Sequence, residues 1–340
     1  MTGSQCFDFT TFQESIFPAW EAQFKVGPRI GDYSFAKGGK VDSYGTTDLL
    51  IAKYIMNDIG TLTDAQKDEW ARIINSFQDQ ATGKYVKAYT MHFWEHTTAY
   101  AVCALKLIDR KPAYPMAWKN DILRDRKSMT AWTRQWQRAP WSLIWPGSHI
   151  WSGVPAALAM TGEGTDEFFE WYFDWFDKAA DPSSGYWRRG WLHKMKSLSK
   201  PVSHDLFGAF HMYYVYECMG RKWKYPEKVV DCTLRLQLDT GLWGQTPEFY
   251  CRDLDGLYAL TRSSRNAGGY RADDVKAAVV KFLATAERTL NDRDFVLAHY
   301  PDTHHLAGAL CAIAECQKFY PDIVKTARPW LMSIDKACYI

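Results

Sequence analysis

The sequence has no run of about 18 apolar residues, the length that a helix needs to cross a bilayer, so we expect no membrane-spanning helix. Its first residues, MTGSQCFDFTTF, lack a basic stretch followed by an apolar one, and this predicts that no secretory signal is present. The net charge is only +2, from 41 Lys and Arg against 39 Asp and Glu. A dedicated nucleic-acid binder usually carries a concentrated basic face, so we expect no nucleic-acid partner.

Chemical signatures are also missing. None of the eight cysteines forms a CxxC pair, which is evidence against a zinc ribbon. Single thiols in apolar stretches behave as small hydrophobic residues, and this usage favours a reducing, cytoplasmic setting. Phosphate-loop, dinucleotide-binding and GxSxG motifs are absent. We therefore expect no organic cofactor, while a divalent metal stays possible.

Aromatic residues, in contrast, are abundant. The chain of 340 residues has 16 Trp, 19 Tyr and 18 Phe, which together make up 16% of it. So many large rings either build a bulky core or line a cavity for an apolar or ring-shaped ligand. Composition alone does not separate these two uses.

A degenerate repeat runs through the chain. Six segments rich in Ala, Leu and small residues read as helices, at 43–56, 95–108, 148–160, 203–219, 252–264 and 303–317. They align on the small residues Ala52, Ala99, Gly153, Gly208, Gly256 and Gly308, which are 47 to 55 residues apart. A fixed period of this length is typical of repeat architectures.

More strongly charged amphipathic segments lie between these six, at 63–78, 166–180, 226–238 and 272–290. Such segments are expected to be outward-facing helices. No β-rich stretch is present. We therefore predict an all-α (α/α)6 toroid of six inner and six outer helices over residues 41–340, with 1–40 as an N-terminal lead segment packed on that single domain. Residues 110–145 are its least regular pair.

A short turn recurs after the outer segments, as FQDQATGKY (77–85), DPSSGYW (181–187) and LQLDTGLW (236–243). Glycine after a helix C-terminus adopts the left-handed conformation, and an apolar residue that follows packs back on the helix. Tyr85, Trp187 and Trp243 are therefore predicted to be structural and not to bind a ligand.

These turns, followed by HTTAYAVCALKLI and DGLYALTR, resemble the repeats of the terpenoid-cyclase and protein-prenyltransferase β-subunit toroid superfamily. DPSSGYW is also similar to turns of (α/α)6 glycosidases. The resemblance covers about two repeats and implies the toroid fold. Its functional motifs do not carry over: Leu257 stands where the zinc-binding Asp-Gly-Cys-Tyr element has its thiolate, and Asp253-Leu254-Asp255 lacks the third carboxylate of the cyclase acid motif.

In such a toroid the first turns of the inner helices converge on one end of a central cavity. The residues four positions before the aligned small residues are Asp48, Glu95, His149, His204, Arg252 and His304. Imidazoles beside carboxylates are typical of acid–base chemistry. Our candidate catalytic residues are Asp253, Asp255, His304, His305, Glu95, His96, His204 and Asp205. The candidate substrate-binding residues are His149, Arg252, Asp48, Tyr44, Trp151 and Tyr258.

Plainer interpretations accompany these assignments. His204 and Asp205 can cap a helix, His211 fits a hydrogen-bonded core position, and His92, His193 and His299 are expected on the surface or in loops. Three imidazoles from separate helices, with Asp205 or Glu95, could hold zinc, copper or iron, but we assign no metal ligands. We predict that Asp253→Asn and His304→Ala each abolish activity and leave the fold intact.

The leading hypothesis is an isomerase- or lyase-type enzyme that cyclises, isomerises or dehydrates an apolar, isoprenoid-like small molecule, with aromatic faces stabilising positive charge. A carbohydrate-active hydrolase or lyase on the same architecture is the first alternative, with two carboxylates as acid and base. A non-catalytic ligand-binding toroid is the second. A filled centre would favour the last, and an open cleft with paired carboxylates the carbohydrate enzyme.

Overall fold

The structure is a computed structural model that describes residues 6–85, 92–137, 144–188 and 200–340. Within these ranges the regular secondary structure is almost entirely helical, which confirms the all-α prediction. The strands in these ranges are β1 (Phe7–Asp8) and β2 (Val324–Lys325), which pair in parallel and join the two ends of the chain.

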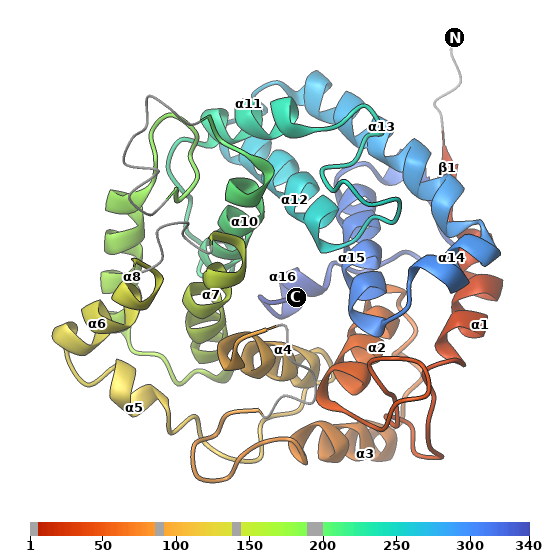
Figure 1. Cartoon of the computed structure of the whole chain (residues 1–340), viewed down its shortest axis with the longest axis horizontal. Helices are drawn as coiled ribbons and strands as arrows, with labels where there is room; N and C mark the ends of the chain where they lie inside the picture. The colour runs from red at the N-terminus through yellow and green to blue at the C-terminus, as the bar shows by residue number, and fades with distance from the viewer. Residues whose placement is uncertain (1–5, 86–91, 138–143, 189–199) are drawn as a thin grey trace.

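Six long helices form an inner ring. They are α2 (Ser43–Ile55), α4 (Trp94–Leu107), α7 (Ile144–Thr161), α10 (Ser203–Cys218), α12 (Cys251–Asn266) and α15 (Thr303–Phe319). Each packs on the next in chain order, and α15 packs on α2, so the ring closes (Figure 1). These helices correspond to the six aligned segments of the sequence.

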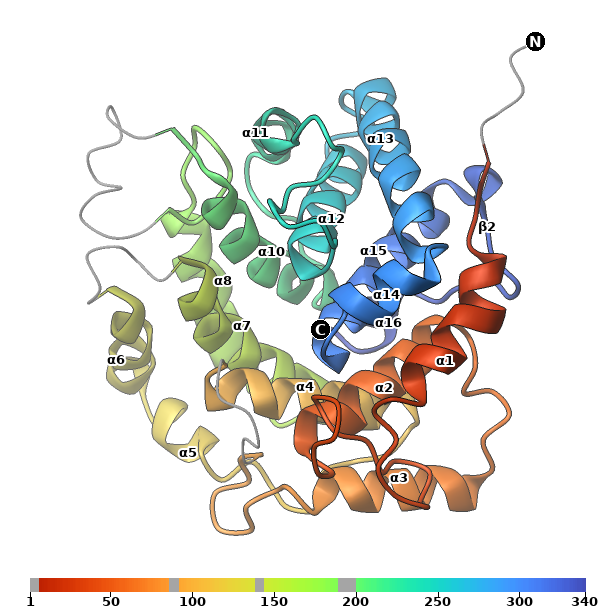
Figure 2. The ribbon, with the colours of Figure 1, turned by 45° about the vertical axis from the view of Figure 1, so that its right-hand side comes forward.

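Further helices lie around this ring (Figures 1 and 2). They are α3 (Asp64–Asn75), α5 (Lys119–Ile122), α6 (Arg126–Gln137), α8 (Asp166–Ala179), α11 (Pro226–Leu236), α13 (Ala272–Leu290) and α14 (Arg293–His299). The predicted capping box at the start of α3 is present, with Thr63 and Gln66 bonding to each other's backbone. The lead segment contains a π-helical turn, η1 (Phe12–Ile16), and α1 (Phe17–Glu21). It attaches where the Trp20 indole donates to the carbonyl of Tyr300.

Two of the aligned glycines lie where inner helices meet closely. A β-carbon at Gly153 of α7 would lie 2.5 Å from the backbone oxygen of Glu95, in the first turn of α4. A β-carbon at Gly308 of α15 would likewise lie 2.7 Å from the backbone nitrogen of Cys251, in the first turn of α12. Glycine is needed because one inner helix begins directly against the backbone of another.

The recurring turns behave as predicted. Gly83, Gly185 and Gly241 have φ values of +77°, +73° and +87°. The ring that follows each one then packs back on the preceding outer helix. Trp187 Nε1 donates to the carbonyl of Phe176, and Trp243 Nε1 donates to that of Thr233. The rings are buried and none of them lines the central cavity, so the structural interpretation of these turns is confirmed.

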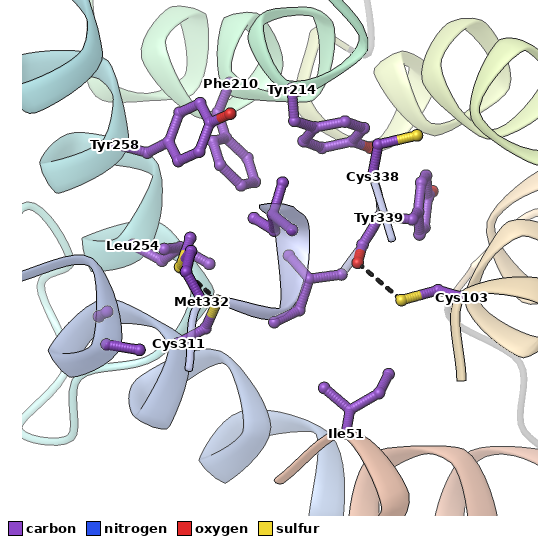
Figure 3. Close-up of a cluster of buried hydrophobic side chains, with 14 of the residues drawn as sticks. Ile51, Cys103, Phe210, Tyr214, Leu254, Tyr258, Cys311, Met332, Cys338 and Tyr339 are labelled. Atoms are coloured by element: carbon purple, nitrogen blue, oxygen red, sulfur yellow. Dashed lines mark hydrogen bonds between the residues drawn. The ribbon is translucent and has the colours of Figure 1, made fainter. Parts of the chain in front are cut away.

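The C-terminal residues fill one half of the ring's interior. After η2 (Pro321–Ile323) and β2, the chain turns inward to α16 (Ser333–Lys336) and ends at the centre (Figure 1). Figure 3 shows this buried cluster, with Ile51, Cys103, Phe210, Tyr214, Leu254, Tyr258, Cys311, Met332, Cys338 and Tyr339. The Cys103 thiol donates to the carbonyl of Tyr339 at 3.1 Å. The C-terminal segment therefore forms a packed floor across the ring's interior.

Ion pairs hold this floor in place. The Arg262 guanidinium of α12 contacts the Glu315 carboxylate at 2.8 Å and the Asp335 carboxylate of α16 at 3.0 Å. Arg262 itself is almost fully buried, so its charge needs these partners. All eight cysteines are free thiols. Among the helices of the described residues, none has the length and apolar character needed to span a membrane.

Candidate functional site

A cavity of about 240 Å³ lies above this floor, at the N-terminal ends of the inner helices. Six aromatic side chains line it: Phe35, Tyr44, Tyr100, Trp145, Phe210 and Tyr250. Six histidines line it as well: His92, His96, His149, His211, His304 and His305. Cys251, Asp302, Gly308 and Ile340 complete the wall. The cavity is thus mainly aromatic, and its polar groups are mostly imidazoles.

Asp48 supports one side of this cavity from behind. Its buried carboxylate accepts hydrogen bonds from the Tyr100 hydroxyl at 2.6 Å and the Thr303 hydroxyl at 2.6 Å. His304 Nδ1 lies 3.0 Å from the same carboxylate. These contacts join α2, α4 and α15, so Asp48 helps to close the ring and also fixes the orientation of His304.

The next residue on α15 repeats this pairing. Asp302 precedes the helix and caps it by accepting the backbone N–H of His305 at 3.0 Å. The same carboxylate lies 2.8 Å from Nδ1 of the His305 ring, which is within ion-pair distance. His305 also packs edge-on against Tyr250, with ring centres 4.5 Å apart. Two adjacent histidines at the start of one helix therefore each have a carboxylate partner.

A different arrangement adjoins His304, whose ring centre lies 5.4 Å from that of Tyr44 and 5.0 Å from that of His92. The Tyr44 hydroxyl lies 2.8 Å from Nδ1 of His96 and 3.1 Å from Nδ1 of His92. The rings of these two histidines stack with centres 4.0 Å apart. His149 packs edge-on against both, with centre distances of 4.6 Å to His96 and 5.0 Å to His92. These three imidazoles therefore contact one another directly.

His149 and His211 form the α7–α10 part of the wall. Their ring centres are 4.6 Å apart, and Nδ1 of His211 lies 2.5 Å from the Ser148 hydroxyl. Nδ1 of His149 is buried without a hydrogen-bond partner in the described residues. His211 is therefore a hydrogen-bonded residue of the interior, as expected, and it also lines the cavity.

The two sides differ in charge. Burial lowers the pKa of His96 and His149 well below the usual value, and the neighbouring imidazoles lower both further. Burial also lowers the pKa of His211, to about 3. For His304, burial acts in the same direction, but the Asp48 charge and hydrogen bond outweigh it and raise the pKa. His304 is thus the histidine that favours a positive charge, whereas His96 and His149 stay neutral.

Several of the predicted site residues do gather at this cavity. His304, His305, His96, His149 and Tyr44 line it, and Asp48 lies directly behind His304. Glu95 and Arg252 do not line it. Their chain neighbours His96 and Cys251 do, because one residue along a helix turns the side chain by about 100°. Arg252 instead stacks on Tyr250.

His204 and Asp205 are placed elsewhere. His204 is exposed at the start of α10 and packs on Trp145, so the expectation that it faces the cavity together with His149 and His304 is wrong. Asp205 is buried and caps α10 by accepting the backbone N–H of Val202 at 2.9 Å. Its carboxylate also pairs with Arg188, which makes it a structural group.

Asp253 and Asp255 do not line the cavity either. The Asp253 carboxylate accepts the backbone N–H groups of Trp243, Gly244 and Tyr250, so it orders the turn that leads into α12. Asp255 is fully buried, and its oxygens lack hydrogen-bond partners in the described part of the chain. Burial, and then the charge of Asp253, raises the pKa of Asp255 well above its usual value, which favours the neutral acid.

Two aromatic candidates also lie away from the cavity. Trp151 is buried against Trp175 and Phe176 on the outer side of α7. Tyr258 belongs to the central floor, where it contacts Phe210 (Figure 3). The Arg262 guanidinium stacks on its ring. Both are core residues, and neither contributes to the wall.

The sequence analysis missed part of the wall. His92 was expected on the surface or in a loop, yet it lies in the cavity against His96. No helical spacing signals this position, because His92 precedes α4, which begins at Trp94. Phe35, from the lead segment, was also missed. His299 is exposed as expected, and His193 lies outside the described residues.

Comparison of the chain with protein-family models, with curated proteins and with solved structures gives no match.

Proposed function

We propose that the protein is an enzyme that moves protons on a small, largely apolar substrate held in this cavity, in an isomerisation or a dehydration. The observation that supports this proposal is the pair of adjacent histidines on α15, each beside its own carboxylate. His304 Nδ1 is 3.0 Å from Asp48, and His305 Nδ1 is 2.8 Å from Asp302.

This arrangement suits acid–base chemistry. The Asp48 carboxylate, hydrogen-bonded to Nδ1 of His304, holds that ring in one orientation and one tautomer, and it leaves Nε2 as the nitrogen that exchanges a proton with a substrate. Asp302 lies within ion-pair distance of His305 Nδ1, without a hydrogen bond between them in the described residues. Two such rings in one cavity allow one imidazole to accept a proton while the other donates one. A double-bond shift needs these two transfers, and so does the loss of water from an alcohol.

The aromatic wall fits the same chemistry. Positive charge that develops on an allylic carbon is attracted to the faces of aromatic rings, and six such side chains surround the cavity. An imidazolium with a pKa near 6.5 is a weak acid for protonating an isolated alkene. For this reason we favour isomerisation or dehydration over a cyclisation that begins with alkene protonation. A volume of about 240 Å³ lies just below the usual range of roughly 300–1,000 Å³ for ligand pockets, so the proposed substrate is small.

The carbohydrate alternative has less support. Glycoside hydrolysis needs two carboxyl groups on opposite sides of the scissile bond, about 5 to 9.5 Å apart. Of the carboxylates in the described residues, only Asp302 lines the cavity. The segments outside the described ranges contain no Asp or Glu that could supply a second. The filled lower half of the ring is consistent with the binding-toroid alternative, but a cavity still lies above it.

An isotope experiment tests the proposal. The protein is incubated in D₂O with a panel of small allylic alcohols and the matching unsaturated ketones, and the products are analysed by mass spectrometry. We expect water loss, a shifted double bond or deuterium uptake for at least one compound. His304→Gln and His305→Gln should each lower that rate by about 10²–10⁴-fold.

The matched control is His299→Gln, because His299 is exposed on α14 away from the cavity. We expect it to keep the wild-type rate. If no compound of the panel reacts, or if both cavity variants keep the wild-type rate, the proposal is wrong.

A further inference from the structure

The part of the cavity wall next to His304 has a feature that acid–base chemistry does not need. Among the described residues, His92, His96 and His149 each offer a ligand atom, and these three atoms lie within 4.8 Å of one another. We propose that these three histidines bind a divalent first-row transition-metal ion of the Zn²⁺ type, with the remaining coordination position open to the cavity.

Tyr44 orients two of the three ligands. Its hydroxyl oxygen can accept N–H bonds from Nδ1 of both His92 and His96, at 3.1 and 2.8 Å. The hydroxyl hydrogen is then directed to the Thr97 hydroxyl, 3.2 Å away. This network leaves both Nε2 atoms without a hydrogen, so each presents a lone pair. Metal-binding histidines characteristically use their other nitrogen in this way, to contact a partner that fixes the ring.

His149 supplies the third ligand and an independent observation. Its side chain is only 6% exposed, and its Nδ1 has no hydrogen-bond partner in the part of the chain that the structure describes. A buried polar atom without a partner costs free energy. A metal ion bound between the three rings gives the His149 side chain a bonding partner that the described residues do not provide.

Binding an ion requires the stacked His92 and His96 rings to rotate so that their nitrogens converge. Zn–N bonds of about 2.0–2.1 Å in a tetrahedral site place the ligand nitrogens roughly 3.4 Å apart. The three atoms already lie within 4.8 Å of one another, so ring rotations close the difference. Three histidines with one open position are a typical donor set of catalytic zinc sites.

The donor set also limits the identity of the ion. Imidazole suits zinc, copper, iron and nickel, whereas magnesium and calcium prefer oxygen ligands. Cys251 lines the cavity, but burial raises the pKa of its thiol well above the usual value, and this opposes a thiolate ligand. The inference does not rest on the proposed function, because binding is measured without any substrate.

Titration of the metal-free protein with Zn²⁺ and with Co²⁺ tests it. We expect one equivalent to bind, and the Co²⁺ form to show the visible bands of a four-coordinate nitrogen and oxygen site. His149→Gln and His96→Gln should each lower the Zn²⁺ affinity at least about 100-fold. Losing a residue that only hydrogen-bonds to a metal ligand typically lowers it by roughly 10–100-fold. His211→Gln is the matched control and should stay within a few-fold of wild type, because His211 lines the same wall outside the triad.

Exposed thiols are removed first, with Cys6→Ser and Cys218→Ser, because both are on the surface and can bind zinc. The wild-type Co²⁺ spectrum reports the ligands directly, so the test survives even if a histidine variant fails to fold. The proposal is overturned if no stoichiometric ion binds. It is equally overturned if the spectrum shows thiolate ligands, or if His211→Gln loses as much affinity as His149→Gln.

Discussion

Two groups of histidines line one cavity and differ in the side chains that contact them. On α15, His304 and His305 each lie against a carboxylate. On α4 and α7, His96 and His149 lie against other imidazoles, and His96 also contacts the Tyr44 hydroxyl. The pKa of His304 is raised, whereas those of His96 and His149 are lowered. The partner thus decides the charge that the same kind of side chain favours.

This contrast separates two kinds of chemistry. A histidine beside a carboxylate accepts a proton readily and can return it, which suits acid–base catalysis. Crowded neutral histidines repel protons and offer lone pairs, which suits a metal ion. Each group can therefore be disabled separately, and the following variants test whether the two roles are as distinct as the structure suggests.

The largest effects should come from replacing one histidine of each group and comparing the two variants. His304→Gln removes a proton-transfer group, so we expect turnover to fall by about 10²–10⁴-fold while Zn²⁺ affinity stays within a few-fold of wild type. His149→Gln should abolish tight Zn²⁺ binding. Turnover of the best panel substrate and a Zn²⁺ titration on both variants check this. If both variants lose both properties to the same degree, the two groups act as one site.

Asp48→Asn addresses the support behind His304. The buried carboxylate accepts hydrogen bonds from Tyr100 and Thr303, and bonds to charged groups contribute about 1.5–3 kcal/mol each. We expect the free energy of unfolding to fall by at least that of one such bond, measured by denaturant titration. Asp48 acts through His304, so kcat should fall while KM changes little. A rise in KM at constant kcat would mean that Asp48 only shapes the cavity.

Tyr44→Phe removes the hydroxyl that orients His92 and His96. Zn²⁺ affinity should drop by about 10–100-fold, the usual effect of losing a partner of a metal ligand. Tyr250→Phe is the control, because Tyr250 lines the cavity beside His305 and away from the triad. Equal affinities for the two variants, measured by calorimetry, would contradict the orienting role of Tyr44.

Asp253→Asn should have the smallest effect. The sequence predicted a loss of activity for this variant, but the carboxylate accepts three backbone N–H groups in a turn. We now expect the free energy of unfolding to fall by roughly 0.5–2 kcal/mol, as for the loss of a helix cap, with turnover within a few-fold of wild type. A variant with normal stability but no turnover would indicate that Asp253 takes part in the reaction.

The sequence predicted the helical class and the turns well, because both depend on local patterns. Gly83, Gly185 and Gly241 must adopt a left-handed conformation, and a glycine followed by an aromatic residue signals this directly. The small residues at Gly153 and Gly308 mark close helix contacts, which recur with the period of the chain. These features need no knowledge of distant residues.

The site was less predictable, because a cavity wall depends on how each helix is rotated. The repeat located the correct turns of α4 and α12, but a step of one residue separates Glu95 from His96 and Arg252 from Cys251. Polar residues at helix starts also serve as caps, so Asp205 and Asp253 could not be distinguished from cavity residues by type. His92 lies just before α4 begins, so the four-residue spacing of a helix does not predict where its side chain lies.

The most direct test of the contrast is anomalous X-ray diffraction from crystals soaked in Zn²⁺, recorded on both sides of the zinc absorption edge. The account predicts one strong cavity peak, about 2.0–2.1 Å from a nitrogen of each of His92, His96 and His149, with His304 still paired to Asp48. An empty cavity, or a zinc ion bound by His304 and Asp48 in place of that triad, would contradict the separation of the two groups.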